Sequence, residues 1–446
     1  MNTPICDFVE KYNQSKALRL HMPGHKGTDI SGAEPFDITE IDGADSLFEA
    51  SGIIKESEDN ASRLFGCDTF YSAEGSSLCI RAMLYLAVMY AKSNGKKPVI
   101  MAGRNAHKTF LTAAVLLDFQ IEWIYSTGSY LTCSIDADKL DATINSSEEK
   151  PTAVYITSPD YLGNTQDIAA IARVCKKNDV LLLVDNAHGA YLKFFENSAH
   201  PTDLGADMCC DSAHKTLPVL TGGAYLHISC DAPGEFAQYA KNALALFAST
   251  SPSYLIMQSL DRANKYIAEG YTQKLEDFAV KTAELKKRLK AKGFALTGNE
   301  PLKLTFATGF IGYSGYKFAQ ELKKRNIICE FADPDFTVLM LTPEIGDRGL
   351  SDLEKALSDI PFKTPVVPKI PPIAALEKAY TPREAAFMKK ETVPVKESLG
   401  RILADLNVGC PPAVPIAVCG EIIDEKAIKC FEYYNITHCT VVSLGM

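Results

Sequence analysis

Short runs of apolar residues alternate with amphipathic segments through the chain from about Phe65 onward. Six of these runs predict strands, because they are apolar without the alternation of a half-exposed strand: residues 99–102, 121–125, 153–157, 180–184, 207–210 and 223–228. Helix-length stretches separate several of them, as in residues 167–177. Strands of this kind joined by helices are typical of a mostly parallel sheet covered on both faces, so the pattern predicts an α/β fold.

Apolar residues also recur at helical spacing after residue 75, and they predict a helix of about four turns that begins near Ser76 or Ser77. The helix would open on Gly75, Ser76 and Ser77. Backbone N–H groups and hydroxyls at a helix N-terminus form an anion site, and glycine lets the backbone approach a phosphate closely. A serine that merely caps the helix fits the same residues, and it is the commoner case for an isolated motif.

The remaining patterns predict five parts. Prolines and glycines argue against any regular element in the first part, and twelve residues rich in proline predict an extended linker. Helical patterns at 274–292 and 315–325 with strand patterns at 302–307 and 338–342 indicate a second, α+β domain. The expected parts are an N-terminal arm (1–35), a large domain (36–255), a small α+β domain (256–360), the linker (361–372) and a C-terminal module (373–446).

Composition narrows the class of protein. The 446 residues suffice for two or three domains, and 46 basic against 55 acidic residues give a net charge of -9 without a basic tail. This balance argues against a nucleic-acid partner and against an anionic membrane surface. The longest apolar runs, such as 113–117, are far shorter than the ~20 residues of a membrane helix.

Cysteine usage and the first residues indicate a compartment. The 13 cysteines are odd in number and include no C-x-x-C pair, so they fit neither a disulfide framework nor a zinc site. The N-terminus has neither the basic leader nor the apolar core of a secretion signal. We therefore expect a reduced, cytoplasmic protein with buried thiols and no metal.

Polar residues follow the predicted strands at the edge where parallel sheets bind ligands. Asp185 ends the run 180–184, and a buried carboxylate there needs a cationic or hydrogen-bonding partner. A protonated pyridine nitrogen is such a partner, and its protonation makes the ring an electron sink; an aspartate that caps the next helix is equally compatible. His107, after 99–102, could stack on a cofactor ring, although a lone histidine at a helix start is more often only a polar terminal residue.

Lys215 lies in the octapeptide 211–218, between small, polar and proline residues after a short apolar run. A lysine amine can hold pyridoxal phosphate as a Schiff base when desolvation or a nearby positive centre lowers its pKa. By itself the octapeptide fits a solvated loop lysine. Together with a strand-end aspartate, a phosphate-suited helix start and an edge histidine, it favours a covalent anchor.

Several ordered motifs carry a resemblance to a known family. The sequence resembles the bacterial-type, pyridoxal-phosphate-dependent ornithine/lysine/arginine decarboxylases, which have the aspartate aminotransferase fold (fold type I). The matching pieces keep the family's order and span nearly the whole chain: residues 20–27, 37–41, 105–108, 185–190, 212–218, 250–254, 411–415 and 420–421.

The resemblance implies a role for each matching residue. Lys215 would carry the Schiff base, Asp185 would pair with the pyridine nitrogen, and His214 or Lys215 would return a proton to Cα. Glu330 would receive the distal positive group of the substrate. The other implied cofactor contacts are His107 and Ala187 on the two ring faces, Gly75, Ser76, Ser77, Ser212 and His214 at the phosphate, His188 beside them, and Thr250 or Ser251 from the neighbouring subunit of a homodimer or larger assembly.

The implied reaction is decarboxylation of arginine, lysine or ornithine to agmatine or a diamine, as in polyamine biosynthesis, by a short form without an N-terminal receiver-like domain. Departures from the family pattern in the C-terminal motif, in the loop 158–162 and at Gly222 and Gly223 lie near the expected substrate. Two alternatives stay open. The protein could be an aminotransferase or eliminating enzyme, which would form an oxo acid, or a cofactor-binding homologue without turnover.

Overall fold

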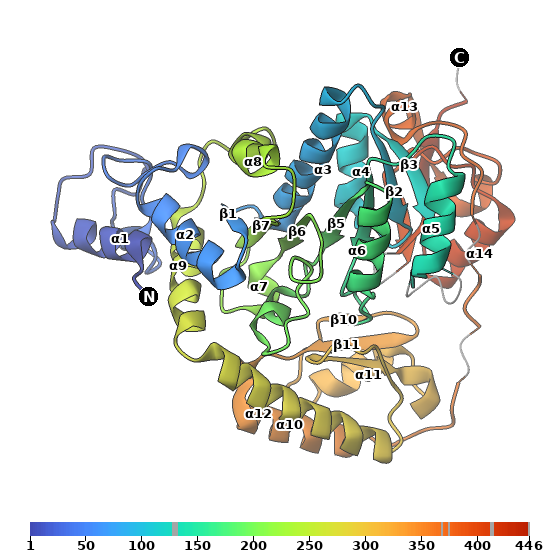
Figure 1. The fold of residues 1–446 in the computed structure, drawn as a ribbon. Helices are drawn as coiled ribbons and strands as arrows, with labels where there is room; N and C mark the ends of the chain where they lie inside the picture. The colour runs from blue at the N-terminus through green and yellow to red at the C-terminus, as the bar shows by residue number, and fades with distance from the viewer. Residues whose placement is uncertain (127–132, 367–368, 373–374, 411–413, 445–446) are drawn as a thin grey trace. The chain divides into compact units, whose positions relative to one another are not determined.

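The computed structural model describes residues 1–126, 133–366, 369–372, 375–410 and 414–444 (Figure 1). Residues 411–413 of the C-terminal motif lie outside these ranges. The chain forms two compact units, each built from two separate stretches: Met1–Lys96 with Ile168–Leu275, and Lys97–Asp167 with Glu276–Met446. The division of the chain into five parts stays a prediction.

Four strands form the sheet of the first unit. They lie in the order β1 (Asp68–Ser72), β7 (Ala224–Ile228), β6 (Met208–Asp211) and β5 (Leu181–Asp185). β5 and β6 are parallel, whereas β7 is antiparallel to both of its neighbours. The apolar runs predicted β5, β6 and β7 to within a residue. β1 was missed because buried hydroxyl residues, Thr69 and Ser72, take positions where the pattern requires apolar ones.

Helices cover this sheet. α3 (Gly75–Ser93) begins where the sequence predicts and packs against β6, β7 and α8 (Glu235–Ala245). α6 (Ile168–Lys177) buries one apolar face against β5 (Figure 1). The unit also contains α2 (Ile53–Phe65), α7 (Ala213–Thr216) and α9 (Tyr254–Ala268), with 3-10 turns at Glu34–Phe36, Leu47–Glu49 and Ala190–Phe194.

The first residues are not irregular throughout, and that expectation is wrong for α1 (Pro4–Gln14). Its first turn carries a proline, and its first N–H groups find a distant acceptor, because the N–H groups of Ile5 and Cys6 both donate to Asp261 Oδ2 at 3.0 Å. A carboxylate on α9 therefore satisfies the helix start. Since that partner is more than 250 residues away, no local pattern reveals it.

The second unit contains a parallel three-stranded array. β2 (Val99–Gly103) lies between β4 (Ala153–Thr157) and β3 (Gln120–Ile124), as unalternated strands predict. α4 (Lys108–Leu117) follows β2, and α5 (Ala137–Ser146) precedes β4.

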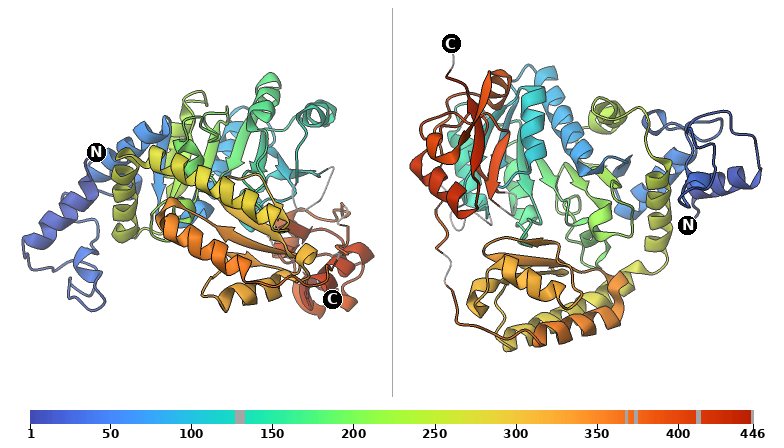
Figure 2. Two further views of the ribbon diagram at one scale, coloured as in Figure 1. Left: turned by 90° about the horizontal axis from the view of Figure 1, so that it is seen from below. Right: turned by 180° about the vertical axis from the view of Figure 1, so that it is seen from behind.

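A four-stranded antiparallel sheet in the order β10 (Phe331–Ala332), β11 (Phe336–Met340), β9 (Lys303–Ala307) and β8 (Leu296–Thr297) accompanies them. α10 (Tyr271–Ala291) and α12 (Gly346–Ser358) lie side by side next to this sheet (Figure 2), where Arg288 pairs with Glu354 at 2.8 Å. α11 (Gly315–Lys323) packs on β11. Further 3-10 turns are Thr308–Ile311 and Pro343–Ile345.

Two antiparallel strand pairs lie in the last part of the chain. β12 (Lys390–Pro394) pairs with β15 (His438–Val442), and β13 (Asn407–Cys410) pairs with β14 (Val414–Val418). α13 (Pro382–Phe387), the 3-10 turn Val395–Glu397 and α14 (Glu425–Tyr433) complete this region, whose core includes Leu403, Ile416, Phe431 and Val441.

Two expectations from composition concern the whole chain. Among the described residues, none of the helices combines the length and apolar content that a membrane crossing requires. The cysteines that the structure describes are all free, and those other than Cys230 and Cys329 are buried.

Candidate active site

Lys215 lies in α7, the single helical turn that follows β6 in the first unit. Its Nζ is 3.2 Å from Nε2 of His188, a buried residue just after β5. The two groups come from the carboxyl ends of neighbouring parallel strands, the edge where such sheets bind ligands. The amine and the imidazole are close enough to share a proton.

Asp185 is the last residue of β5, and only 3% of its surface is exposed. Its Oδ1 accepts from the Ala187 N–H at 3.2 Å and from the Cys210 thiol at 3.8 Å. Hydrogen bonds stabilise a buried carboxylate, and those from a cationic donor do so most strongly. A cationic nitrogen of a bound ring would be such a donor, and its pairing with Asp185 stays a prediction.

The start of α3 offers an anion cradle. Ser212 Oγ donates to Ser76 Oγ at 2.7 Å, so two hydroxyls meet at this helix end, with Ser77 next in the first turn. The side chain of the N-cap residue, Glu74, makes no capping hydrogen bond, and the first turn contains no acidic residue. Gly75 has φ +72°, and a Cβ there would meet nothing within 4 Å. Open space beside N–H groups and hydroxyls fits a phosphate.

Gly222 and Gly223 bring the turn after Lys215 against this cradle. The Gly75 N–H donates to Gly222 O at 2.7 Å, and a Cβ on Gly222, whose φ is +102°, would lie 3.1 Å from the Ala73 carbonyl oxygen. Gly223 O accepts from His214 Nδ1 at 3.0 Å, which fixes that ring. The two glycines permit this close approach of the turn to the start of α3.

Thr250 and Ser251 lie in the exposed stretch between α8 and α9. The Ser251 N–H donates to Ser249 Oγ at 3.1 Å, and the Ser249 N–H donates to Glu74 Oε1 at 2.7 Å. The stretch is thus attached to the residue that precedes Gly75 in the same chain. A contact of Thr250 or Ser251 with a neighbouring subunit's cofactor stays a prediction.

His107 and its loop belong to the second unit. His107 is the N-cap of α4, where Nδ1 accepts from the Thr109 N–H at 3.3 Å, so the structure shows the capping role that its position allows. A buried bidentate pair holds the same loop, because Arg104 donates to Glu421 at 2.8 and 2.7 Å. The glutamate of the C-terminal motif therefore fixes the loop that carries His107. Stacking of His107 on a ring stays a prediction.

Glu330 is exposed just before β10 in the second unit, and its Oε1 accepts from the Tyr161 hydroxyl at 2.9 Å. Burial and the Glu330 charge raise the pKa of Tyr161 well above its usual range. A cavity of about 470 Å³ adjoins the carboxylate, and its other lining includes Ile328, Leu339, Leu341, Ile345 and Leu353. Tyr161 lies in the loop 158–162, and the sequence did not indicate its contact with Glu330, because the two residues are 169 positions apart.

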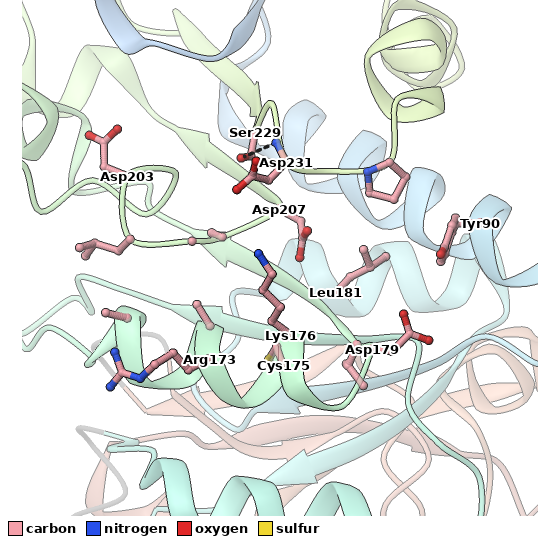
Figure 3. A pocket seen from close by; sticks show the side chains of 17 residues that line it. Tyr90, Arg173, Cys175, Lys176, Asp179, Leu181, Asp203, Asp207, Ser229 and Asp231 are labelled. Carbon is pink, nitrogen blue, oxygen red and sulfur yellow. Dashed lines mark hydrogen bonds between the residues drawn. The ribbon is translucent and has the colours of Figure 1, made fainter.

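A larger cavity of about 580 Å³ lies elsewhere in the first unit (Figure 3). It opens at the amino ends of β5 and β6, near Leu181 and Asp207, whereas Asp185 and Lys215 lie at the carboxyl ends. Its charged lining mixes Arg173 and Lys176 with Asp179, Asp203, Asp207 and Asp231. The predicted site residues take no part in it.

Within the first unit, the structure thus brings together an amine, a buried carboxylate and an anion cradle at one sheet edge. Such a set of groups is suited to an anionic cofactor that reacts with amines. Residues 3–308 match the family model "Orn/Lys/Arg decarboxylase, major domain", and residues 368–441 match "Orn/Lys/Arg decarboxylase, C-terminal domain". The protein belongs to the Orn/Lys/Arg decarboxylase family, whose members are pyridoxal-phosphate-dependent lyases.

Relatives in sequence cover nearly the whole chain. The arginine decarboxylase of Halalkalibacterium halodurans is 29% identical over 95% of this chain and 91% of its own length. The arginine decarboxylase of Bacillus subtilis is 28% identical over 96% of this chain and 92% of its own.

Solved structures share the fold. The Francisella novicida lysine decarboxylase superposes with a TM-score of 0.80 at 17% identity, over 99% of this chain and 81% of that one. The constitutive lysine decarboxylase of Escherichia coli gives 0.78 at 16% identity, over 99% and 82%. The predicted α/β class, fold type I, is confirmed.

Proposed function

We propose that this decarboxylase of basic amino acids prefers arginine and holds pyridoxal 5′-phosphate on Lys215. The observation that carries the proposal is the placement of the Lys215 amine 3.2 Å from His188, at the sheet edge that also bears Asp185 and the Ser76–Ser212 cradle. Arginine is favoured over lysine and ornithine because the Halalkalibacterium and Bacillus relatives, which match over more than nine-tenths of their length, are arginine decarboxylases.

In this proposal, residues of the first unit bind the cofactor and transfer the proton. Ser76, Ser212 and the first N–H groups of α3 bind the phosphate, and Asp185 keeps the ring nitrogen protonated through a charge-assisted hydrogen bond. When bound, pyridoxal phosphate supplies an electron sink for the electrons that carbon dioxide leaves behind. Lys215 attaches the cofactor, and its amine, beside His188, returns a proton to Cα.

Residues of the second unit recognise the substrate in this proposal. The Glu330 carboxylate accepts the distal cation, and the Tyr161 hydroxyl fixes its orientation. A guanidinium presents a planar fork that matches a carboxylate in a bidentate pair. The aliphatic lining of the adjoining cavity suits the methylene stem of a basic amino acid.

The test is a product analysis. Purified protein loaded with pyridoxal phosphate is incubated with L-arginine, L-lysine and L-ornithine, and carbon dioxide and amines are measured. We expect equimolar carbon dioxide and agmatine from arginine, with lower rates for the other two. Turnover confined to lysine or ornithine would overturn the arginine preference. An oxo acid product would establish the aminotransferase alternative, and a bound cofactor without product would establish the homologue without turnover.

We further propose that the enzyme works as a homodimer in the cytoplasm, with Thr250 or Ser251 reaching the partner's cofactor. The exposure of that stretch and the free, mostly buried thiols support this. Light scattering on the purified protein should give twice the chain mass, and a monomeric, fully active enzyme would refute the shared site.

A further inference from the structure

Asp211 is a fully buried carboxylate immediately before Ser212, and it has none of the roles described above. Three side chains donate to it. Asn186 Nδ2 lies 2.6 Å from Oδ1, and Nε2 of His200 and Nε2 of His227 each lie 3.1 Å from Oδ2. A carboxylate without partners at this depth would be strongly destabilising. Burial alone would raise the pKa of Asp211, but the two histidines outweigh it and hold the pKa well below the usual range.

Hydroxyl groups orient both histidines. Thr202 Oγ1 lies 2.8 Å from Nδ1 of His200, and Thr69 Oγ1 lies 2.9 Å from Nδ1 of His227. Each hydroxyl can donate to Nδ1, which leaves a hydrogen on each Nε2 that points at Asp211. Ligand atoms of His200, Cys209 and Asp211 lie within 4.8 Å of one another, a grouping that the cysteine spacing did not indicate. The hydrogen bond between His200 and Asp211 and the contact of Cys209 with His200 account for the short distances within this group.

The third donor connects Asp211 to the predicted ring-nitrogen partner. Asn186 directly follows Asp185, and its backbone N–H donates to Cys210 O at 3.0 Å. The chain just after Asp185 is therefore attached to β6 twice, once through its backbone and once through the Asn186 side chain. On the other side of Asp211, Ser212 donates to Ser76 in the anion cradle. Asp211 thus lies between the two groups that would hold opposite ends of one cofactor.

We infer that Asp211 is a positioning residue that fixes, through Asn186, the placement of the Asp185 carboxylate relative to the Ser212–Lys215 turn. This inference rests on the proposed function, since it presumes a cofactor that spans Asp185 and Ser212. Two buried histidines hold the Asp211 carboxylate in one orientation. The hydrogen bond from Asn186 therefore also restricts the turn that follows Asp185. Without that bond, the Asp185 side chain loses its fixed distance from the phosphate cradle and from the Lys215 amine.

A double-mutant cycle tests the inference. Asp211→Ala, Asn186→Ala and the double variant are titrated with pyridoxal phosphate, and affinity is measured from the visible absorbance and circular dichroism of the bound cofactor. Each single variant should bind the cofactor roughly ten- to a hundredfold more weakly, the range for a hydrogen bond to a charged group. Each single variant should also have a lower kcat, while its KM for the amino acid stays within about threefold of the unmodified enzyme. The double variant should be no worse than Asp211→Ala, because both changes cut one connection. Fully additive losses would overturn the positioning role.

Asp261→Ala is the matched control, since Asp261 is another fully buried carboxylate of the same unit. It accepts from the N–H groups of Ile5 and Cys6 and from Ser57, away from the β5 and β6 ends. We expect this variant to melt at a lower temperature with cofactor affinity and dichroism unchanged. Equal cofactor losses in Asp261→Ala and Asp211→Ala would show that only general stability is involved.

Asn186→Ala alone keeps the inference testable if Asp211→Ala does not fold, because it leaves Asp211 with its two histidines. Unchanged cofactor affinity and dichroism in Asn186→Ala would refute the positioning role while the unmodified enzyme still releases carbon dioxide. Failure of the unmodified protein to bind pyridoxal phosphate at all would instead overturn the proposed function. The two failures are thus distinguishable.

Discussion

Two buried aspartates near strand ends, one in each unit, have pKa values shifted in opposite directions. Asp211 ends β6 in the first unit and accepts from two histidines and an asparagine, so its pKa is lowered. Asp160 follows β4 in the second unit, where the backbone and side-chain amides of Asn164 donate to it at 2.8 Å, and burial raises its pKa to about 6.

The difference lies in the partners rather than in depth, because both side chains are almost inaccessible. A cation does lie near Asp160, but Lys303 donates to its backbone carbonyl at 3.2 Å and forms an ion pair with Glu300 at 2.9 Å. The charge of Lys303 is therefore shared with another carboxylate. Burial raises the pKa of an aspartate unless a group with ionic character is aimed at the carboxylate itself. The first unit supplies such groups at the predicted cofactor edge, and the second unit uses neutral amides.

The largest effect is expected from the amine at the cofactor edge. Lys215→Ala should abolish covalent cofactor attachment and lower decarboxylation by at least about a thousandfold, because both the attachment and the proton donor are lost. Borohydride reduction followed by peptide mass analysis should find the cofactor on Lys215 only in the unmodified protein. Lys176→Ala, an exposed lysine of the same unit (Figure 3), should leave both measurements unchanged. Turnover retained in Lys215→Ala would overturn the assignment.

The next effect concerns Asp185, the last residue of β5. Asp185→Asn keeps the size of the side chain but removes the negative charge that would stabilise a protonated ring nitrogen. We therefore expect kcat to fall roughly a hundredfold. Asp207→Asn is the control. Asp207 lies just before β6, at the amino ends of the strands, and its side chain accepts from the Leu182 N–H at 2.7 Å. Steady-state rates of carbon dioxide release should separate the two variants. A similar loss in both would contradict a charge-specific role for Asp185.

Asp160 allows a test of the opposite pKa shift, because its pKa is raised whereas that of Asp211 is lowered. Its folded-state pKa of about 6 exceeds the ordinary value of 3.8. The folded state therefore binds its proton more tightly, and the stability from this group is present below pH ~4 and lost as the pH rises through about 6. Asp160→Asn should remove that loss and raise the free energy of unfolding at pH 7.5 by up to about 3 kcal/mol. The side-chain amide of Asn164 can rotate so that its oxygen accepts from the new amide group.

Denaturant unfolding midpoints between pH 4 and pH 7.5 measure this effect. The unmodified protein should lose stability across that window more steeply than Asp160→Asn. Asp7→Asn, at an exposed aspartate of α1, should keep the slope of the unmodified protein. If Asp160→Asn also keeps that slope, Asp160 is not protonated in the folded state at pH 5.

The smallest effect is expected at Glu330, the exposed carboxylate proposed to bind the distal cation of the substrate. Glu330→Gln should raise KM for the basic amino acid about tenfold and change kcat and cofactor affinity little, because a solvated carboxylate contributes modestly to binding. Tyr161→Phe, which removes only the hydroxyl donated to Glu330, should raise KM by about threefold. Cofactor titration accompanies the kinetics. Equal losses of cofactor and substrate binding in Glu330→Gln would contradict its role.

The sequence by itself determined the elements that depend on local pattern. Unalternated apolar runs predicted β2 to β7 except for their end residues, and helical spacing predicted the start of α3, because a buried strand or an amphipathic helix needs apolar residues at fixed intervals. The ordered motifs that span nearly the whole chain, among them those around Asp185 and Lys215, identified the family, and the family models confirm it. Their shared order along the chain made a chance match of such short pieces implausible.

Only the tertiary structure decided which distant groups meet. α1 exists where proline and glycine argued against it, since Asp261 satisfies its first N–H groups. Likewise, nothing near Asp211 in the sequence indicates that His200 and His227 flank it, or that Tyr161 contacts Glu330. Polar side chains carry no periodic signal, and a hydrogen bond depends on two atoms brought within about 3 Å by the whole fold. The octapeptide 211–218 thus revealed its lysine in the sequence, whereas the role of its aspartate became visible only in three dimensions.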